Sequence, residues 1–108
     1  MTAFPVDDLL AAQAQSGESW HEFFRVPDMS AGLYVLPAGG DDPQSPHPQD
    51  ELYLVLEGRG TLRVDGADRP VAKGDLLYVA KHAEHGFHSI AEDLKLLVIF
   101  APAYTGRD

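Results

Sequence analysis

Five histidines are the residues of this chain best suited to chemistry: His21, His47, His82, His85 and His88. Neutral imidazole is a common ligand of transition metals, and a nearby carboxylate often completes such a site. His47 lies four residues before Glu51, at the start of an apolar run, and three of the histidines gather between residues 82 and 88. If a histidine of that second group meets His47 and Glu51 across a barrel, the three would form a metal site.

The elements that must position these residues are predicted to be mostly β-strands. Short apolar or aromatic runs alternate with turns rich in glycine, proline and aspartate, and their even spacing favours a sandwich or a barrel. The expected strands span residues 20–26, 31–36, 52–57, 61–64, 69–72, 76–80, 86–90 and 94–100. One short helix is expected before them at residues 6–15, with Asp7 or Asp8 as its cap and Gly17 at its end.

Two glycine turns are predicted to reverse the chain between these strands. Gly58-Arg59-Gly60 is expected to be a short hairpin loop between residues 52–57 and 61–64, because glycine adopts positive φ at little cost. Asp65-Gly66 is expected to be the next turn.

Alternation along one strand predicts which side chains face the interior. Glu51, Tyr53 and Val55 share one face, and the leucines between them form the other face. Residues 94–100 are likewise apolar on both faces apart from Lys95. Strands that are apolar on both sides are covered on both sides, and one short helix offers little cover. We therefore expect a homodimer, formed through Leu52, Leu54, Leu56, Leu97 and Ile99.

Charge and composition exclude several classes of function. With 17 acidic and 8 basic residues the formal charge is −9, which argues against a nucleic-acid or membrane-surface partner. The absence of cysteine excludes disulfides, thiol catalysis and iron–sulfur clusters. A chain of 108 residues is expected to form one domain, residues 1–108. Since neither a basic leader nor a membrane-length apolar run is found, a cytoplasmic location is predicted.

Two segments resemble the two sequence motifs of the cupin family. The first motif is matched by Gly39, Ser45-Pro46-His47, Glu51 and Gly58. The second motif is matched by Gly74, Ala80-Lys81-His82, His85 and Ser89. The resemblance to small single-domain cupins covers about residues 31–100. It implies an all-β fold, a double-stranded β-helix or jelly-roll barrel, with its core at about residues 20–100 behind the short N-terminal helix.

The resemblance also implies a ligand set for one divalent metal. Carried over position by position, the metal ligands are His47, Glu51 and His85, and the metal would be Zn, Fe, Mn or Ni. Ser45 stands where the family has a further histidine, and we expect its side chain to face this open ligand position. Two histidines and one carboxylate still make a workable open site. His82 and His88 are expected at the rim or surface, and His21 on a partly exposed strand.

Two functions remain open at this point. The first is a metal-binding cupin with a barrel pocket for a small organic molecule, in the manner of dioxygenases, isomerases or lyases. In such an enzyme Glu51 or a pocket histidine would move protons and Tyr53 would orient the substrate. The alternative is a metal-independent small-molecule binding or sensing module, in which His47, Glu51 and His85 act as hydrogen-bonding groups.

Overall fold

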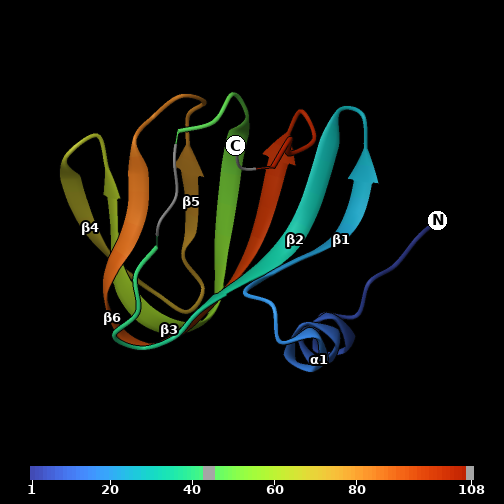
Figure 1. Cartoon of the computed structure of the whole chain (residues 1–108), viewed down its shortest axis with the longest axis horizontal. Helices are drawn as coiled ribbons and strands as arrows, with labels where there is room; N and C mark the ends of the chain where they lie inside the picture. The colour runs from blue at the N-terminus through green and yellow to red at the C-terminus, as the bar shows by residue number, and fades with distance from the viewer. Residues whose placement is uncertain (43–45, 107–108) are drawn as a thin grey trace.

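The computed structural model describes residues 1–42 and 46–106, and within them strands are the main secondary structure (Figure 1). Its elements, in chain order, are α1 (Val6–Ser16), β1 (Trp20–Val26), β2 (Met29–Leu36), β3 (Asp50–Val64), β4 (Ala67–Ala72), β5 (Leu76–Val79) and β6 (His85–Ala101). The expected all-β class with one short N-terminal helix is confirmed.

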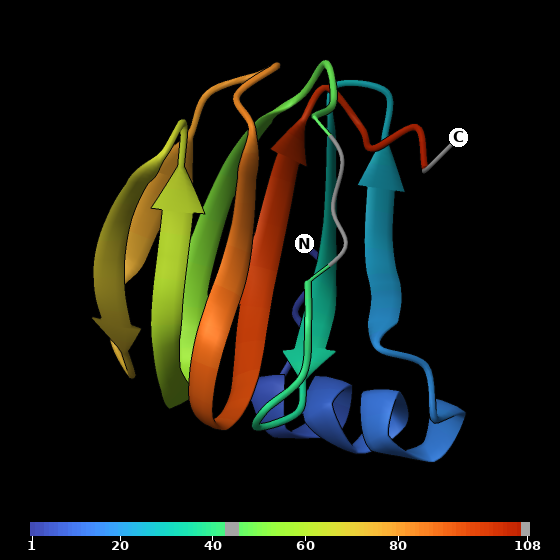
Figure 2. The same cartoon turned by 60° about the vertical axis from the view of Figure 1, so that its left-hand side comes forward.

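The strands form one antiparallel sheet that curves around a common interior (Figure 1). Its order is β1-β2-β6-β3-β4, and β5 pairs with the first part of β3. The long strands β3 and β6 pair with each other along most of their length. β2 pairs with β6, β4 pairs with β3, and β1 extends the sheet beyond β2. Figure 2 shows α1 lying across one end of β1 and β2, against which it packs.

Alternation along the strands decides which side chains fill the interior. Tyr53 and Val55 on β3 are buried, and Leu52 and Leu54 lie on the opposite face. On β6, Leu94, Leu96 and Val98 are buried in the same way. Alternate residues of a strand share a face, so the inner rows of β2, β3 and β6 meet in one apolar cluster. This core packs against the inner face of β3, on which Glu51 lies.

The predicted hairpin at Gly58-Arg59-Gly60 is wrong, because β3 runs through these residues as one strand. Gly58 has φ +93°, and a side chain there would collide with the backbone of Asp93 on β6. The register of β3 against β6 shifts on both sides of Gly58. Gly58 therefore allows a β-bulge and a bend within β3, and the chain does not reverse its direction there. The two strands expected at residues 86–90 and 94–100 are likewise one strand, β6.

The ends of the helix differ in part from the prediction. Gly17 ends α1 in the left-handed conformation, as expected, at φ +71°. The N-cap is Pro5, and no side chain caps the helix, so the expected capping by Asp7 or Asp8 is wrong. Both carboxylates lie in the first turn, where they complement the helix dipole. Within the described residues, no helix has the length and apolar character needed to span a membrane.

The turn at Asp65-Gly66 is confirmed. It joins β3 to β4, which pair from Val64 opposite Ala67 onward.

Candidate metal centre

His47, Glu51 and His85 lie together in the interior, although they come from distant parts of the chain. His47 precedes β3, Glu51 lies near the start of β3, and His85 begins β6. Their candidate ligand atoms all lie within 4.8 Å of one another. Oε1 of Glu51 is 3.2 Å from Nε2 of His47 and 3.1 Å from Nε2 of His85. The three side chains, called the triad below, are only 8%, 1% and 1% exposed.

A backbone carbonyl sets the orientation of His85. Its Nδ1 donates a hydrogen bond to the carbonyl oxygen of Ala83 at 2.9 Å. Because Nδ1 carries the proton, Nε2 of the neutral ring presents a lone pair toward the Glu51 carboxylate. Metal-binding histidines are commonly oriented in this way by a bond from their other nitrogen.

Opposing effects set the charges of Glu51 and His85. Burial raises the pKa of Glu51, but its interactions with His47, His85 and Tyr53 outweigh that effect and hold the pKa below its usual value. Burial lowers the pKa of His85, but the Glu51 carboxylate and the Ala83 carbonyl outweigh it and the pKa is raised. The triad therefore favours an ionised carboxylate with a positive charge close to it.

The triad fits a divalent transition metal. The nitrogen–oxygen distances are short, but the contacts lack hydrogen-bond geometry. Within the described residues, both ring nitrogens of His47, Nε2 of His85 and both oxygens of Glu51 have no hydrogen-bond partner. Buried polar atoms are rarely left without partners, and a cluster of them points to a missing ion or water. Two imidazoles and one carboxylate are also a donor set that such metals accept. This group can hold one metal ion.

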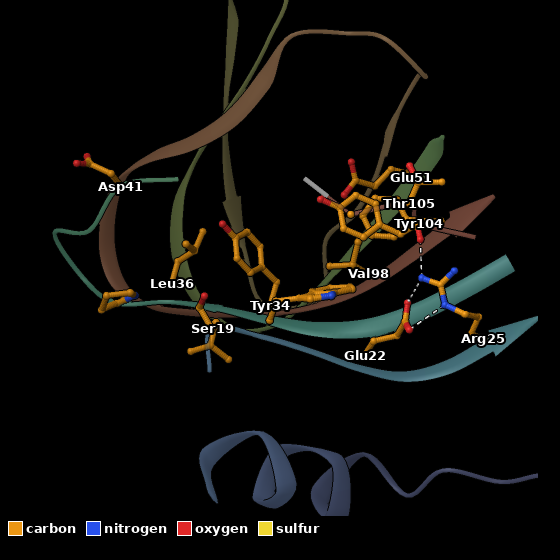
Figure 3. Close-up of a pocket in the computed structure, with 15 residues that line it drawn as sticks. Ser19, Glu22, Arg25, Tyr34, Leu36, Asp41, Glu51, Val98, Tyr104 and Thr105 are labelled. Carbon is orange, nitrogen blue, oxygen red and sulfur yellow. Dashed lines mark hydrogen bonds and ion pairs between the residues drawn. The ribbon is translucent and has the colours of Figure 1, made fainter. Parts of the chain in front are cut away.

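A cavity of about 770 Å³ opens beside the triad, with Glu51 in its wall (Figure 3). Four aromatic rings, called the aromatic wall below, line it: Trp20, Tyr34, Phe100 and Tyr104. Phe100 and Tyr104 are stacked with ring centroids 4.4 Å apart, and the Trp20 ring meets both of them edge-on. A small molecule in this cavity would lie against apolar ring faces and next to the buried Glu51.

The family of the chain follows from its similarity to known proteins. Residues 32–100 match the family described as Cupin_2, cupin domain. This chain is a cupin. An uncharacterized protein of Streptomyces coelicolor, SCO3923, is 44% identical to it over 102 residues, which are 94% of this cupin and 97% of that protein. The crystal structure of BH2720 from Bacillus halodurans has a TM-score of 0.82 over 98% of this cupin and 84% of that chain, at 18% identity. That likeness bears on the fold alone.

One matched relative has a name that states an activity. Dimethylsulfoniopropionate lyase DddW of Ruegeria pomeroyi is 34% identical over 76 residues. The matched segment is 70% of this cupin and 50% of the lyase, so the chain spans about half the length of that enzyme.

Tyr53 of this cupin is on the same inner face of β3 as Glu51, but it does not line the cavity. It is fully buried, its ring packs edge-on against Phe87 at 5.0 Å, and its interaction with Glu51 helps to lower the pKa of that carboxyl. Its position suits holding Glu51 in place. The expected role of Tyr53 in orienting a substrate stays a prediction.

The other histidines lie outside the triad. His82 is exposed at φ +66°, and its backbone N–H donates to the carbonyl oxygen of His47 at 2.8 Å. Nε2 of His88 lies 3.0 Å from Oδ1 of Asp68, at the surface. His21 lies on β1 and is partly buried. Ser45 lies outside the described residues.

Sequence reasoning missed part of the cavity. Trp20 and Tyr104 line it, and Arg25 stands at its margin beside Glu22 (Figure 3). Trp20 and Arg25 precede the segment that resembles the cupin motifs, and Tyr104 follows it. The one signal in the sequence was the cluster of aromatic residues in β1.

Proposed function

We propose that this cupin binds a divalent transition metal at the triad and a small organic molecule in the adjoining cavity. The observation that carries the proposal is the cluster of buried donor atoms without partners, two imidazoles and one carboxylate, placed beside a cavity of about 770 Å³. A buried carboxylate is costly without a cation, and a metal ion bound by all three side chains would remove that cost.

His47, Glu51 and His85 would hold the metal, which supplies a Lewis acid able to polarise an oxygen atom of the bound molecule. Glu51 also lines the cavity, so its side chain would lie next to that molecule. Tyr53 and the imidazoles keep this carboxylate ionised near neutral pH. The aromatic wall would hold the apolar part of the molecule and exclude water.

If the protein is an enzyme, a lyase is the first reaction class to test, before a dioxygenase or an isomerase. The support is the similarity of 76 residues to a protein named as a lyase, together with an ionised carboxylate at the cavity wall. A carboxylate in that position suits the removal of a proton from a bound molecule.

Metal analysis tests the proposal directly. We expect about one transition-metal ion per chain after reconstitution, and loss of metal in His47→Ala and His85→Ala. His88→Ala and His21→Ala are matched controls, because they remove imidazoles that lie outside the triad, and they should keep the metal. Equal metal content in all four variants would place the metal elsewhere and refute the assignment.

The alternative is a binding or sensing module that needs no metal. One observation favours it: the pKa of Glu51 is lowered while that of His85 is raised, so the two side chains can form an ion pair unaided. If wild-type protein takes up none of Zn, Fe, Mn and Ni after reconstitution, this alternative replaces the first proposal.

We also propose that a second copy of the chain covers the outer face of β3, β5 and β6. Leu52 lies between Tyr78 of β5 and Ile99 of β6 in the sheet, and Leu54 lies between Leu76 and Leu97. Leu76 and Tyr78 are 64% and 63% exposed. None of these six residues carries a charge. Because the chain has a formal charge of −9, two copies would meet at this patch with little electrostatic repulsion.

A further inference from the structure

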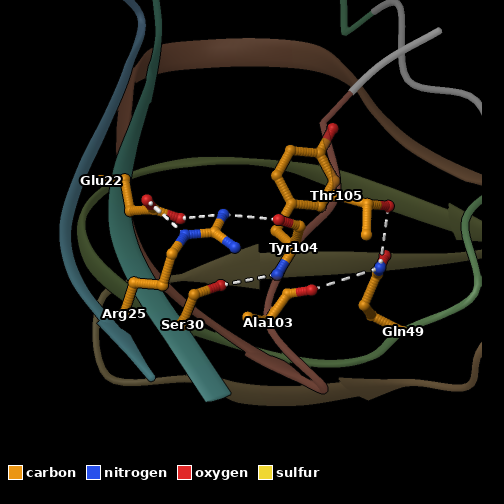
Figure 4. A network of polar contacts seen from close by, with 7 residues as sticks. All are labelled: Glu22, Arg25, Ser30, Gln49, Ala103, Tyr104 and Thr105. Carbon is orange, nitrogen blue, oxygen red and sulfur yellow. Dashed lines mark hydrogen bonds and ion pairs between the residues drawn. The ribbon is translucent and has the colours of Figure 1, made fainter. Parts of the chain in front are cut away.

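The C-terminal return, residues 102–106, follows β6 and folds back beside the cavity, where side chains from distant segments hold it (Figure 4). The N–H of Ala103 donates to the carbonyl oxygen of Pro27, which lies between β1 and β2, at 3.3 Å. The side-chain amide of Gln49, just before β3, donates to Thr105 Oγ1 at 3.1 Å. The return is thereby tied to the turn between β1 and β2 and to the segment that carries His47.

The backbone of Tyr104 is held on both sides. Its N–H donates to the hydroxyl oxygen of the buried Ser30 at 2.8 Å. Its carbonyl oxygen accepts a hydrogen bond from Nη2 of Arg25. Glu22 in turn accepts from Nε and Nη2 of Arg25, at 3.0 and 2.8 Å. A guanidinium held by a carboxylate through two bonds has a fixed plane, so Arg25 is a rigid support for the Tyr104 carbonyl.

This support fixes the Tyr104 ring next to the triad. The ring stacks on Phe100 at an interplanar angle of 17°, and its centroid is 5.8 Å from that of the His47 ring. Among residues 1–42 and 46–106, no group forms a hydrogen bond with the Tyr104 hydroxyl, while Tyr104 and Glu51 both line the cavity (Figure 3). A phenol donor without an acceptor among the described residues thus lines the cavity beside the three candidate metal ligands.

We infer that Tyr104 is a ligand-contacting residue whose hydroxyl donates a hydrogen bond to an oxygen atom of the molecule bound at the triad, and that Arg25 positions it. The inference rests on the proposed function, because it needs a metal at the triad. It names the ligand class as a small carboxylate with an apolar or aromatic body. One end supplies anionic oxygens to the metal and the phenol, and the other packs on the aromatic wall.

Benzoate is the probe for the hydroxyl. We expect calorimetric titration of the zinc-loaded protein to show benzoate binding, with acetate binding more weakly because it lacks a ring. Tyr104→Phe keeps the ring and removes the hydroxyl, and it should weaken benzoate binding about tenfold at unchanged zinc content. Tyr78→Phe removes a hydroxyl that is bonded to Asp50 on the outer face, and it should leave binding unchanged.

Two results would overturn this assignment. Benzoate binding to Tyr104→Phe with wild-type affinity would show that the hydroxyl does not contact the ligand. No benzoate binding to zinc-loaded wild type would refute the ligand class. If instead the wild type takes up no metal, the proposed function itself fails. The zinc content of the protein is measured before the titration, so this outcome is distinguished from the other two.

Trp20 tests the positioning by Arg25 without any metal. It is the sole tryptophan, and its ring centroid lies 5.9 Å from that of Tyr104. Arg25→Ala should release the return and raise the acrylamide quenching of Trp20 in metal-free protein, and Arg25→Lys should restore part of the protection. Arg59→Ala removes an exposed arginine paired with Glu92 on another part of the sheet, and it should change nothing. Wild-type quenching in Arg25→Ala would overturn the positioning role.

Discussion

Replacing Gly58 by alanine should destabilise the protein far more than the loss of a small residue suggests. At φ +93° this position already disfavours any residue with a Cβ. A Cβ at this position collides with the carbonyl oxygen of Asp93 on the facing strand β6. Since the colliding atom belongs to the backbone of a long paired strand, it cannot move aside without disturbing the β3–β6 ladder.

The expected cost has two parts. Positive φ costs an alanine roughly 1 kcal/mol, and forcing an extra atom against packed backbone adds roughly 2 kcal/mol. Gly58→Ala should therefore lower the free energy of unfolding by about 3 kcal/mol, a large share of the roughly 5–15 kcal/mol typical of a domain. For a chain of this size the melting temperature should fall by roughly 15 °C.

Gly74 provides a matched control because it has the same φ, +93°, and a methyl group on its Cα would meet no other atom within 4 Å. Gly74→Ala therefore carries only the backbone cost, about 1 kcal/mol and roughly 5 °C. Circular dichroism melts and urea titrations of the two variants measure the difference. Equal losses in both would refute the reasoning, because they would show that contact with Asp93 contributes nothing.

Three further predictions concern the site and the surface. Excess Zn²⁺, present at about a hundred times its Kd, should raise the melting temperature of wild type by roughly 10 °C. In Glu51→Gln the melting temperature should shift little, and an equal rise in both proteins would argue against Glu51 as a ligand. Asp50 accepts a hydrogen bond from the Tyr78 hydroxyl at 2.8 Å and raises the pKa of that phenol. In Asp50→Asn the pKa of Tyr78 should fall toward its usual value. An alkaline absorbance titration of tyrosine at 295 nm that is unchanged in the variant would count against this pairing. Leu52→Asp should convert the expected dimer to a monomer in light scattering, and a wild type that is already monomeric would exclude the dimer.

The core of the site was predictable because its pattern is local. Alternation along β3 placed Glu51, Tyr53 and Val55 on the inner face, and all three are buried. The cupin motifs then selected His47 and His85 from five histidines, and the structure brings both to Glu51. A period of two residues and a spaced motif are both visible in sequence without knowing which strands pair.

Other features depend on pairing between distant segments. A glycine with positive φ serves a reversal or a bulge equally well, and only the contact of Gly58 with Asp93 decides between them. The position of Tyr104 depends on Arg25 and Ser30, which precede it by most of the chain. No local pattern in residues 102–106 indicates these partners, so this part of the cavity was missed.

The pairing of β3 with β6 also bears on when the metal site comes into existence. His47 and Glu51 are neighbours along the chain, but His85 reaches them only once β6 has paired with β3, where it lies opposite Val64. Bringing together residues so far apart in the chain costs conformational entropy. Only the contacts formed when β3 and β6 pair offset this cost. Of the three triad residues, only His47 and Glu51 are therefore near neighbours in the unfolded chain. The complete triad exists only in the folded chain, so a metal ion bound by all three side chains would stabilise the folded state.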